Sequence, residues 1–254
     1  MGVTVVIPCF NEAGTIGDLL RAMPPEILGH RVTIVVVDDG STDQSWQEVD
    51  RCRSNLAGSL EIQLLRSPSN QGKGAALQVA MDHVRTEPFD ALVWMDSDGQ
   101  HLPTSLEELV RPVVDGEVDL CVGSRYLHRT RQKKAPLNRR LVRSAVRSSV
   151  VGITGFTISD PFSGLRCFSR TAFGALQLDG DGYEAELESC FSVARAGLKF
   201  CEVPIQRIYG PQMSKMGYRH GAFRGRLIVV ASYVRTIYGA RAHAPAIAPV
   251  GAHG

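Results

Sequence analysis

The chain contains 254 residues, of which 44% are hydrophobic and 21% are charged, and its formal net charge is +2. These values fit one globular domain with a full apolar core and exclude a disordered chain. The six cysteines stand singly, with no C-x-x-C pair and no signal peptide before them, so we expect reduced thiols and not a disulfide framework. No apolar run approaches the ~20 residues of a membrane-spanning helix, so we expect a chain that does not cross a membrane.

Short apolar runs alternate with helix-like segments over the first 124 residues. The predicted strands cover residues 3–7, 32–37, 62–65, 91–95 and 118–122, and the predicted helices cover residues 15–23, 74–84 and a segment after the capping pair Ser41 and Thr42. This alternation is typical of β-α-β units, so we predict an α/β fold with a mostly parallel central sheet.

Polar segments follow three of these strands directly. Residues 8–12 (Pro-Cys-Phe-Asn-Glu) follow the first strand, residues 38–43 (Asp-Asp-Gly-Ser-Thr-Asp) the second, and residues 96–100 (Asp-Ser-Asp-Gly-Gln) the fourth. In open α/β sheets, ligands bind outside the carboxyl ends of the strands. The segments therefore predict a binding site at one edge of the sheet, although residues 38–43 taken alone also fit a turn with a helix cap.

The third polar segment carries two carboxylates one residue apart, Asp96 and Asp98, followed by Gln100. Mg²⁺ and Mn²⁺ favour oxygen ligands and are usually held by one or two carboxylates together with the oxygens of a substrate diphosphate. The pattern predicts a metal clip for a nucleotide diphosphate, and its alternative is a polar turn that closes the strand.

A glycine-rich loop, residues 70–74 (Asn-Gln-Gly-Lys-Gly), leads into the predicted helix at 74–84. Its backbone N–H groups and Lys73 suit a phosphate, and its alternative is an ordinary loop before a helix N-terminus. The spacing is not that of a Walker loop, and no G-x-G-x-x-G follows the first strand. Together with the polar segments, this loop predicts a bound nucleotide.

These segments, in this order and followed by Gly123-Ser124-Arg125-Tyr126, resemble the family 2 glycosyltransferases of GT-A fold. Later motifs at residues 160–166, 182–184, 202–205 and 214–215 resemble the branch that synthesises polyprenyl-phosphate (dolichyl-phosphate) mannose and glucose. The resemblance covers residues 3–216. It implies a GT-A fold with a mostly parallel central sheet and helices on both faces.

The resemblance also implies roles for individual residues. Mg²⁺ or Mn²⁺ is expected on Asp96, Asp98 and Gln100. Arg125 and either Arg139 or Arg140 are expected on the acceptor side, because paired guanidinium donors suit a phosphate. Lys215 lies where the family has a loop that closes over the diphosphate, although Gln212 replaces the usual glycine of that loop. The residues expected to hold the base and ribose, with Lys73 beside them, are Pro8, Phe10, Glu12, Val37 and Asp39.

The roles of four further side chains have alternative interpretations. Asp160 precedes a proline, so it either shapes a turn or places a carboxylate near the sugar. Glu184 and Glu186 point to different faces of a helix, so we expect at most one of them, Glu184, to face the site. His101 either orients the metal ligands or closes their loop, and we favour the loop.

Two family features are missing from the sequence. Processive polysaccharide synthases carry Gln-x-x-Arg-Trp, but Trp46 and Trp94 are the only tryptophans and neither follows an arginine. We therefore expect one sugar per acceptor. Many relatives append transmembrane helices, and the absence of such a segment here leads us to expect a protein that sits on the membrane surface or uses a membrane-embedded partner subunit.

The charged residues are unevenly distributed along the sequence, although the net charge is small. The first 124 residues carry 8 Lys and Arg against 19 Asp and Glu, and the remainder carries 20 against 7. We therefore expect a nucleotide-sugar and metal half at residues 1–124, an acceptor-binding, membrane-facing half at residues 125–241 and a disordered tail at residues 242–254.

Nine Lys and Arg and no carboxylate lie between residues 125 and 147. A helix at residues 137–151 aligns Arg139, Arg143 and Arg147 in one stripe, which suits anionic lipid headgroups. The alternative is a solvated face over the core. We expect no nucleic-acid partner, because no binding motif accompanies the charge.

We accordingly expect inverting transfer of one hexose from a nucleotide sugar to a polyprenyl phosphate at the inner face of the cytoplasmic membrane. GDP-mannose is favoured over UDP-glucose as the donor. A lipid monophosphate is already anionic and needs no general base, whereas a hydroxyl acceptor needs one. Two alternatives stay open: a glycosyltransferase with a hydroxyl acceptor on a soluble metabolite or glycan, and a non-catalytic nucleotide-binding subunit of a membrane complex.

Overall fold

A computed structural model describes residues 2–127, 137–179, 184–206 and 236–237, with the side chains of residues 137–142 excepted. The predicted tail at 242–254 and Lys215 lie outside these residues. No helix in the described part of the chain is long and apolar enough to cross a membrane. All six cysteines are free thiols, as the sequence predicts.

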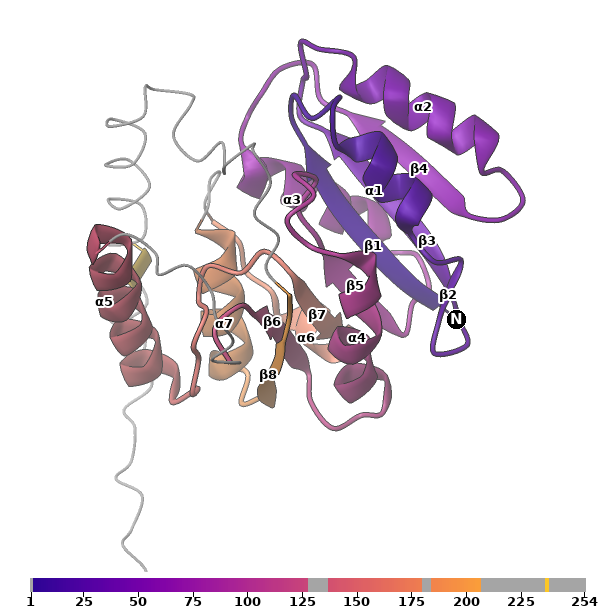
Figure 1. Cartoon of the computed structure of the whole chain (residues 1–254). Helices are drawn as coiled ribbons and strands as arrows, with labels where there is room; N and C mark the ends of the chain where they lie inside the picture. Colours follow the sequence, from indigo (N-terminus) through magenta and orange to yellow (C-terminus); the bar gives the residue numbers. More distant parts are fainter. Residues whose placement is uncertain (1, 128–136, 180–183, 207–235, 238–254) are drawn as a thin grey trace, which may run out of the picture.

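One mixed sheet runs through the molecule (Figure 1). Its order is β2-β3-β1-β5-β7-β6-β8, with β4 also paired to β3. Strands β1, β3, β4 and β5 are mutually parallel, β8 is parallel to β6, and β7 runs antiparallel to both of its neighbours. The strands are β1 (Gly2–Cys9), β2 (Glu26–Ile27), β3 (His30–Asp38), β4 (Glu61–Arg66), β5 (Ala91–Trp94), β6 (Leu120–Ser124), β7 (Arg166–Ser169) and β8 (Phe200–Pro204).

Helices cover both faces of this sheet. Alternate strand residues face opposite sides, so Val5 and Ile7 join one apolar cluster and Val6 joins the other. The first cluster packs under α1 (Ile16–Ala22), α2 (Ser45–Asn55) and α4 (Leu106–Val114). The second packs under α3 (Lys73–Val84), α5 (Leu137–Thr154), α6 (Arg170–Ala175) and α7 (Ala185–Arg195). The predicted α/β class and the helix at 137–151 are therefore confirmed.

The reversed direction of β7 brings its preceding loop, residues 158–164, to the edge where the parallel strands β5 and β6 end. The fully buried Arg166 holds this loop. Its guanidinium donates to the carbonyls of Ser163 (2.9 Å) and Pro161 (3.0 Å), to Ser189 Oγ (3.1 Å) and to Cys190 Sγ (3.1 Å). A buried cation is costly unless its donors are hydrogen-bonded, and these neutral acceptors satisfy the Arg166 guanidinium.

Replacing Arg166 by Met should lower the free energy of unfolding by about 2 to 4 kcal/mol, because it leaves several buried acceptors without donors. Urea unfolding of the purified protein measures this. Arg53→Met is the matched control, since Arg53 is half-exposed and pairs with Asp50 on its own helix. The control should change stability by less than about 0.5 kcal/mol. Equal effects of the two substitutions would contradict the role given to Arg166.

Candidate active site

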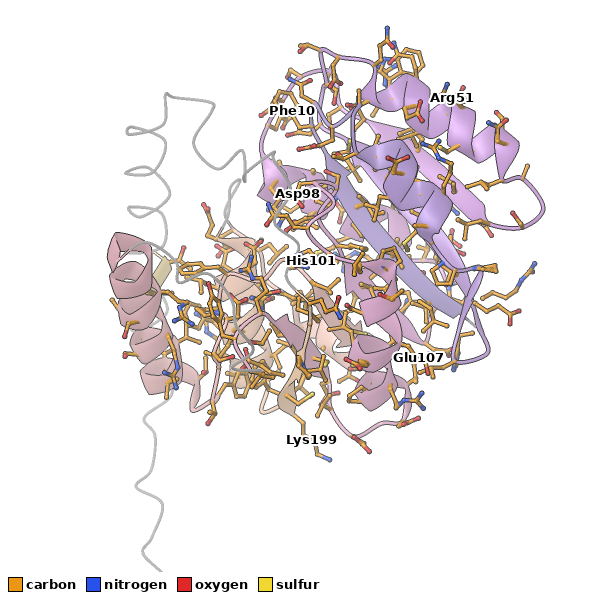
Figure 2. All side chains as sticks on the ribbon, in the orientation of Figure 1. Phe10, Arg51, Asp98, His101, Glu107 and Lys199 are labelled. Atoms are coloured by element: carbon orange, nitrogen blue, oxygen red, sulfur yellow. The ribbon has the colours of Figure 1, made fainter. Side chains whose placement is uncertain are left out.

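The polar segments predicted from the sequence gather at one edge of the sheet. Phe10 and Asp98 lie toward this end of the molecule, and Lys199 lies at the opposite end (Figure 2). Phe10 follows β1, Asp39 follows β3, Asp98 lies beyond β5, and Arg125 follows β6. The carboxyl ends of parallel strands lie at the same edge of a sheet. The segments that follow these strands are therefore expected to lie together.

Asp39 organises the glycine-rich loop. This buried side chain accepts the backbone N–H groups of Gln71 (2.9 Å) and Gly72 (2.8 Å) through its two oxygens. The next residue, Gly40, has a φ of +67°, and a Cβ there would lie 2.5 Å from the backbone of Ser69. The turn after β3 and the loop before α3 are therefore packed directly against each other, which only glycine permits at position 40.

Lys73 joins the two halves of the chain. Its Nζ lies 2.5 Å from Asp96 Oδ1 and 2.6 Å from Glu186 Oε1, which is on α7. Burial opposes the ammonium, but the two carboxylates outweigh it and raise the pKa of Lys73. Burial likewise opposes the Asp96 carboxylate, yet Lys73 and His101 hold its pKa well below the ordinary value. Both groups are therefore charged at neutral pH.

Asp98 has the opposite electrostatic environment. Burial, and after it the negative charge of Asp96, raises the pKa of Asp98, although Asp98 Oδ1 accepts the N–H of Gln100 at 3.0 Å. Glu12 adds further like charge. A divalent cation would relieve this crowding, and carboxylate oxygens are the ligands that Mg²⁺ and Mn²⁺ prefer.

No group of three His, Cys, Asp or Glu side chains with the arrangement of a metal site occurs within the described ranges. Two carboxylates such as Asp96 and Asp98 fit a cation that takes its remaining ligands from a bound substrate and water. Gln100 is half-exposed beside them.

Two residues next to Asp96 fix its position. The buried His101 places Nε2 3.7 Å from Asp96 Oδ2 and contributes to the low pKa of Asp96, so this histidine does more than close its loop. Gly164 approaches from the loop before β7, where a Cβ would lie 2.3 Å from Asp96 Oδ2. The glycine leaves room for the carboxylate.

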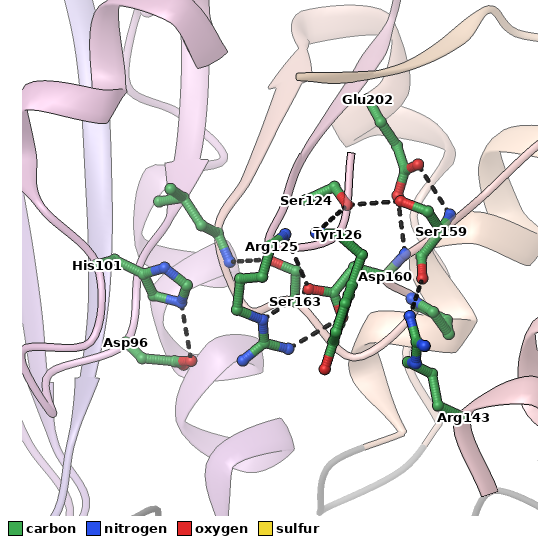
Figure 3. A network of polar contacts seen from close by, with 12 residues as sticks. Asp96, His101, Ser124, Arg125, Tyr126, Arg143, Ser159, Asp160, Ser163 and Glu202 are labelled. Atoms are coloured by element: carbon green, nitrogen blue, oxygen red, sulfur yellow. Dashed lines mark hydrogen bonds and ion pairs between the residues drawn. The ribbon is translucent and has the colours of Figure 1, made fainter. Parts of the chain in front are cut away.

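Arg125 is held by Asp160. The fully buried Asp160 carboxylate accepts Arg125 Nε at 2.6 Å and Nη2 at 3.0 Å, and also its backbone N–H at 3.2 Å (Figure 3). Burial opposes the carboxylate, but Arg125 outweighs this and lowers the pKa of Asp160. The structure therefore gives Asp160 a partner within the protein. The negative charge of Asp96 also contributes to the raised pKa of Arg125.

The predicted arginine stripe of α5 has another use in the structure. Arg143 donates to the Ser159 carbonyl (3.4 Å) and its guanidinium lies 3.8 Å from the centre of the Tyr126 ring. Arg147 donates to the Ile158 carbonyl at 2.8 Å. Two of the three arginines thus bond to the loop before β7, although Arg147 remains exposed, and contact of the stripe with lipid stays a prediction.

The other predicted site residues divide into three groups. Phe10 is 38% exposed, whereas Pro8 and Val37 are buried in the sheet, so the Val37 side chain offers no surface to a base. The side chains of Arg139 and Arg140 lie outside the described residues, as does Lys215. Glu184 precedes α7, and it is Glu186 that contacts Lys73, which corrects our choice between the two.

Sequence reasoning missed Gly164 and the buried contact of His101. Gly164 stood inside a recognised motif, Ser163-Gly164, but a turn accounts for that pair equally well. The sequence offered both Glu184 and Glu186 as candidates. Which of the two faces the site depends on the segments that pack against the helix, and the sequence does not show these.

Comparison with known proteins defines the class. Residues 4–174 match the family model described as glycosyl transferase family 2, and the chain belongs to this family. It is a glycosyltransferase. Polyprenol monophosphomannose synthase of Mycolicibacterium smegmatis is 29% identical over 249 residues, covering 91% of each chain. UDP-N-acetylglucosamine–dolichyl-phosphate N-acetylglucosaminyltransferase of Methanococcus voltae is 26% identical over 219 residues, covering 82% of this chain and 86% of that protein.

The fold is GT-A, as the resemblance implied. Glucosyl-3-phosphoglycerate synthase of Mycobacterium tuberculosis, crystallised with phosphoglyceric acid, superposes with a TM-score of 0.69. The alignment covers 94% of this chain and 79% of that one, at 21% identity.

Replacing Gly164 by Ala should displace Asp96 and weaken binding of Mn²⁺ with GDP or UDP by about tenfold or more, since small misplacements of a site carboxylate are costly. Isothermal titration calorimetry measures the affinity. Gly174→Ala is the control, because a Cβ at that position meets nothing within 4 Å. Unchanged affinity in Gly164→Ala would show that Asp96 does not hold the cation.

Proposed function

We propose that the protein transfers one hexose, with inversion, from a nucleotide sugar to a polyprenyl phosphate at the cytoplasmic face of a membrane. GDP-mannose is the favoured donor and UDP-glucose the second. Two relatives named for polyprenol or dolichyl phosphate, aligned over more than four fifths of the chain, support the acceptor class.

The donor binds at the carboxyl edge of β1, β3 and β5 in this proposal. Phe10, Glu12 and Asp39 face the base and ribose. Asp96, Asp98 and Gln100 would hold Mg²⁺ or Mn²⁺, and such a cation would supply positive charge that stabilises a diphosphate leaving group. Glucosyl-3-phosphoglycerate synthase has been crystallised with Mn²⁺ and uridine diphosphate, which makes Mn²⁺ the first cation to test. Lys73 adds a second positive charge beside Asp96.

The proposal of a phosphate acceptor rests on the charged partners of two buried carboxylates. Asp160 is bonded to Arg125, and Glu186 is bonded to Lys73. Asp160 has both oxygens bonded to Arg125 and is therefore not placed to act as the general base that a hydroxyl acceptor needs, whereas Glu186 keeps one buried oxygen, Oε2, without a partner among the described residues. A phosphate monoester is already anionic near neutral pH and needs to be steered by cations, for which Arg125 is placed between Asp160 and the Asp96 side of the site. Arg139 or Arg140 and Lys215 belong to the same proposal as further acceptor-side residues.

A lipid acceptor requires contact with a membrane. We assign this contact to the basic half of the chain, residues 125–241, and to anionic lipids beneath it, with a membrane-embedded partner subunit as a further element. Leu127, an exposed apolar side chain beside Arg125, is placed to take part.

Incubation of the purified protein with Mn²⁺, a short-chain polyprenyl phosphate and radiolabelled GDP-mannose or UDP-glucose should move acid-labile label into organic solvent. The matched control is Asp98→Asn, which removes a predicted metal ligand. It should reduce transfer by about a hundredfold or more. Because the pKa of Asp98 is raised, the control should leave the melting temperature of the metal-free protein unchanged or higher.

Label that stays in the aqueous phase as a glycoside would favour a hydroxyl acceptor and contradict the proposal. Full activity of Asp98→Asn would contradict the metal assignment independently of the acceptor.

A further inference from the structure

The loop before β7 reaches both sides of the active site, and Glu202 on β8 holds it from behind. Glu202 Oε2 accepts the N–H of Ser159 at 2.8 Å, and its Oε1 accepts the N–H of Asp160 at 3.0 Å (Figure 3). A carboxylate that receives two adjacent backbone donors makes two charge-assisted hydrogen bonds and fixes the peptide between them.

The contacts of Glu202 indicate what its charge is for. Both oxygens of the Glu202 carboxylate are bonded to the backbone of this loop. The hydroxyls of Ser124 and Ser159, 2.5 Å apart, tie the same peptide to the end of β6. The position of the Asp160 backbone is therefore set by β8 and β6 together.

The position of Asp160 in turn sets that of Arg125. Both Asp160 oxygens are bonded to the Arg125 side chain, through Nε and Nη2, while Nη1 takes no part in the pair. A bidentate pair of this kind fixes the plane of the guanidinium as well as its position. A shift of the 159–160 peptide would pass directly to the group that we assign to the acceptor phosphate.

We propose that Glu202 is a positioning residue for Arg125, acting through the backbone and carboxylate of Asp160. Its effect on the acceptor rests on the proposed function, whereas its effect on Arg125 itself does not. Glu202 touches neither donor nor acceptor, so its loss should affect acceptor binding and leave nucleotide binding intact.

The chain contains a matched control at the opposite end of the same strands. Asp119, which precedes β6, accepts Ser169 Oγ at 2.9 Å and the backbone N–H of Lys199 at 3.0 Å. It uses two carboxylate oxygens to join neighbouring strands, as Glu202 does, but far from Arg125. Asp119→Asn therefore reproduces the structural loss without the positioning loss.

The test compares Glu202→Gln with Asp119→Asn by two measurements. Glu202→Gln should raise the KM for a short-chain polyprenyl phosphate by about tenfold or more, the effect of one lost charge-assisted hydrogen bond. Its affinity for GDP or UDP with Mn²⁺ should stay unchanged. In ¹⁵N spectra of the protein alone, the Arg125 Nε–H signal, assigned with Arg125→Lys, should lose its protection from solvent exchange. Asp119→Asn should keep both the KM and the signal.

An unchanged Arg125 signal and KM in Glu202→Gln, or equal changes in Asp119→Asn, would overturn the proposal. If the wild-type protein does not use the polyprenyl phosphate, the proposed function fails, and the Arg125 signal still decides the role of Glu202. Glu202→Asp, whose shorter carboxylate cannot reach both N–H groups, gives the same comparison should Glu202→Gln not fold.

Discussion

The antiparallel direction of β7 is the constraint on which the site depends. A parallel strand in that place would begin at the far edge of the sheet and leave its preceding loop there. Because β7 is reversed, the loop before it meets the segments that follow β5 and β6. Gly164 then packs against Asp96, and Asp160 reaches Arg125. Asp96 and Arg125 are thereby positioned by one sheet.

The charges at this edge are arranged in compensated groups. Glu186, Lys73 and Asp96 form one group, and Asp160 and Arg125 form the other. Glu186 and Asp160 are buried and their partners half-buried, where an unpaired charge would be costly. Asp98 differs, because burial and Asp96 raise its pKa and a cation is the counter-charge that suits it. The first group joins the two halves of the sequence, because Lys73 comes from the acidic half and Glu186 from the basic half.

Much of this was predictable from the sequence, because apolar runs and polar strand ends are local signals. The strands β1, β3, β4, β5 and β6 and the edge that carries Asp39 and Asp96 followed from them. The sequence could not predict the tertiary arrangement of distant segments. The short segment Arg166–Ser169, for example, has no feature that fixes the direction of this strand in the sheet. The orientation of α7, which brings Glu186 to Lys73, and the loop carbonyls that receive Arg143 and Arg147 likewise depend on packing between distant segments.

The central claim is that Asp96 and Asp98 hold a divalent cation on a nucleoside diphosphate at this edge of the sheet. Crystals soaked with Mn²⁺ and GDP or UDP test it through the anomalous scattering of manganese. The account predicts one strong peak in contact with both carboxylates and with the diphosphate, and Lys73 within reach of the phosphates. A bound nucleotide without a peak there, or a peak with either aspartate turned away, would contradict it.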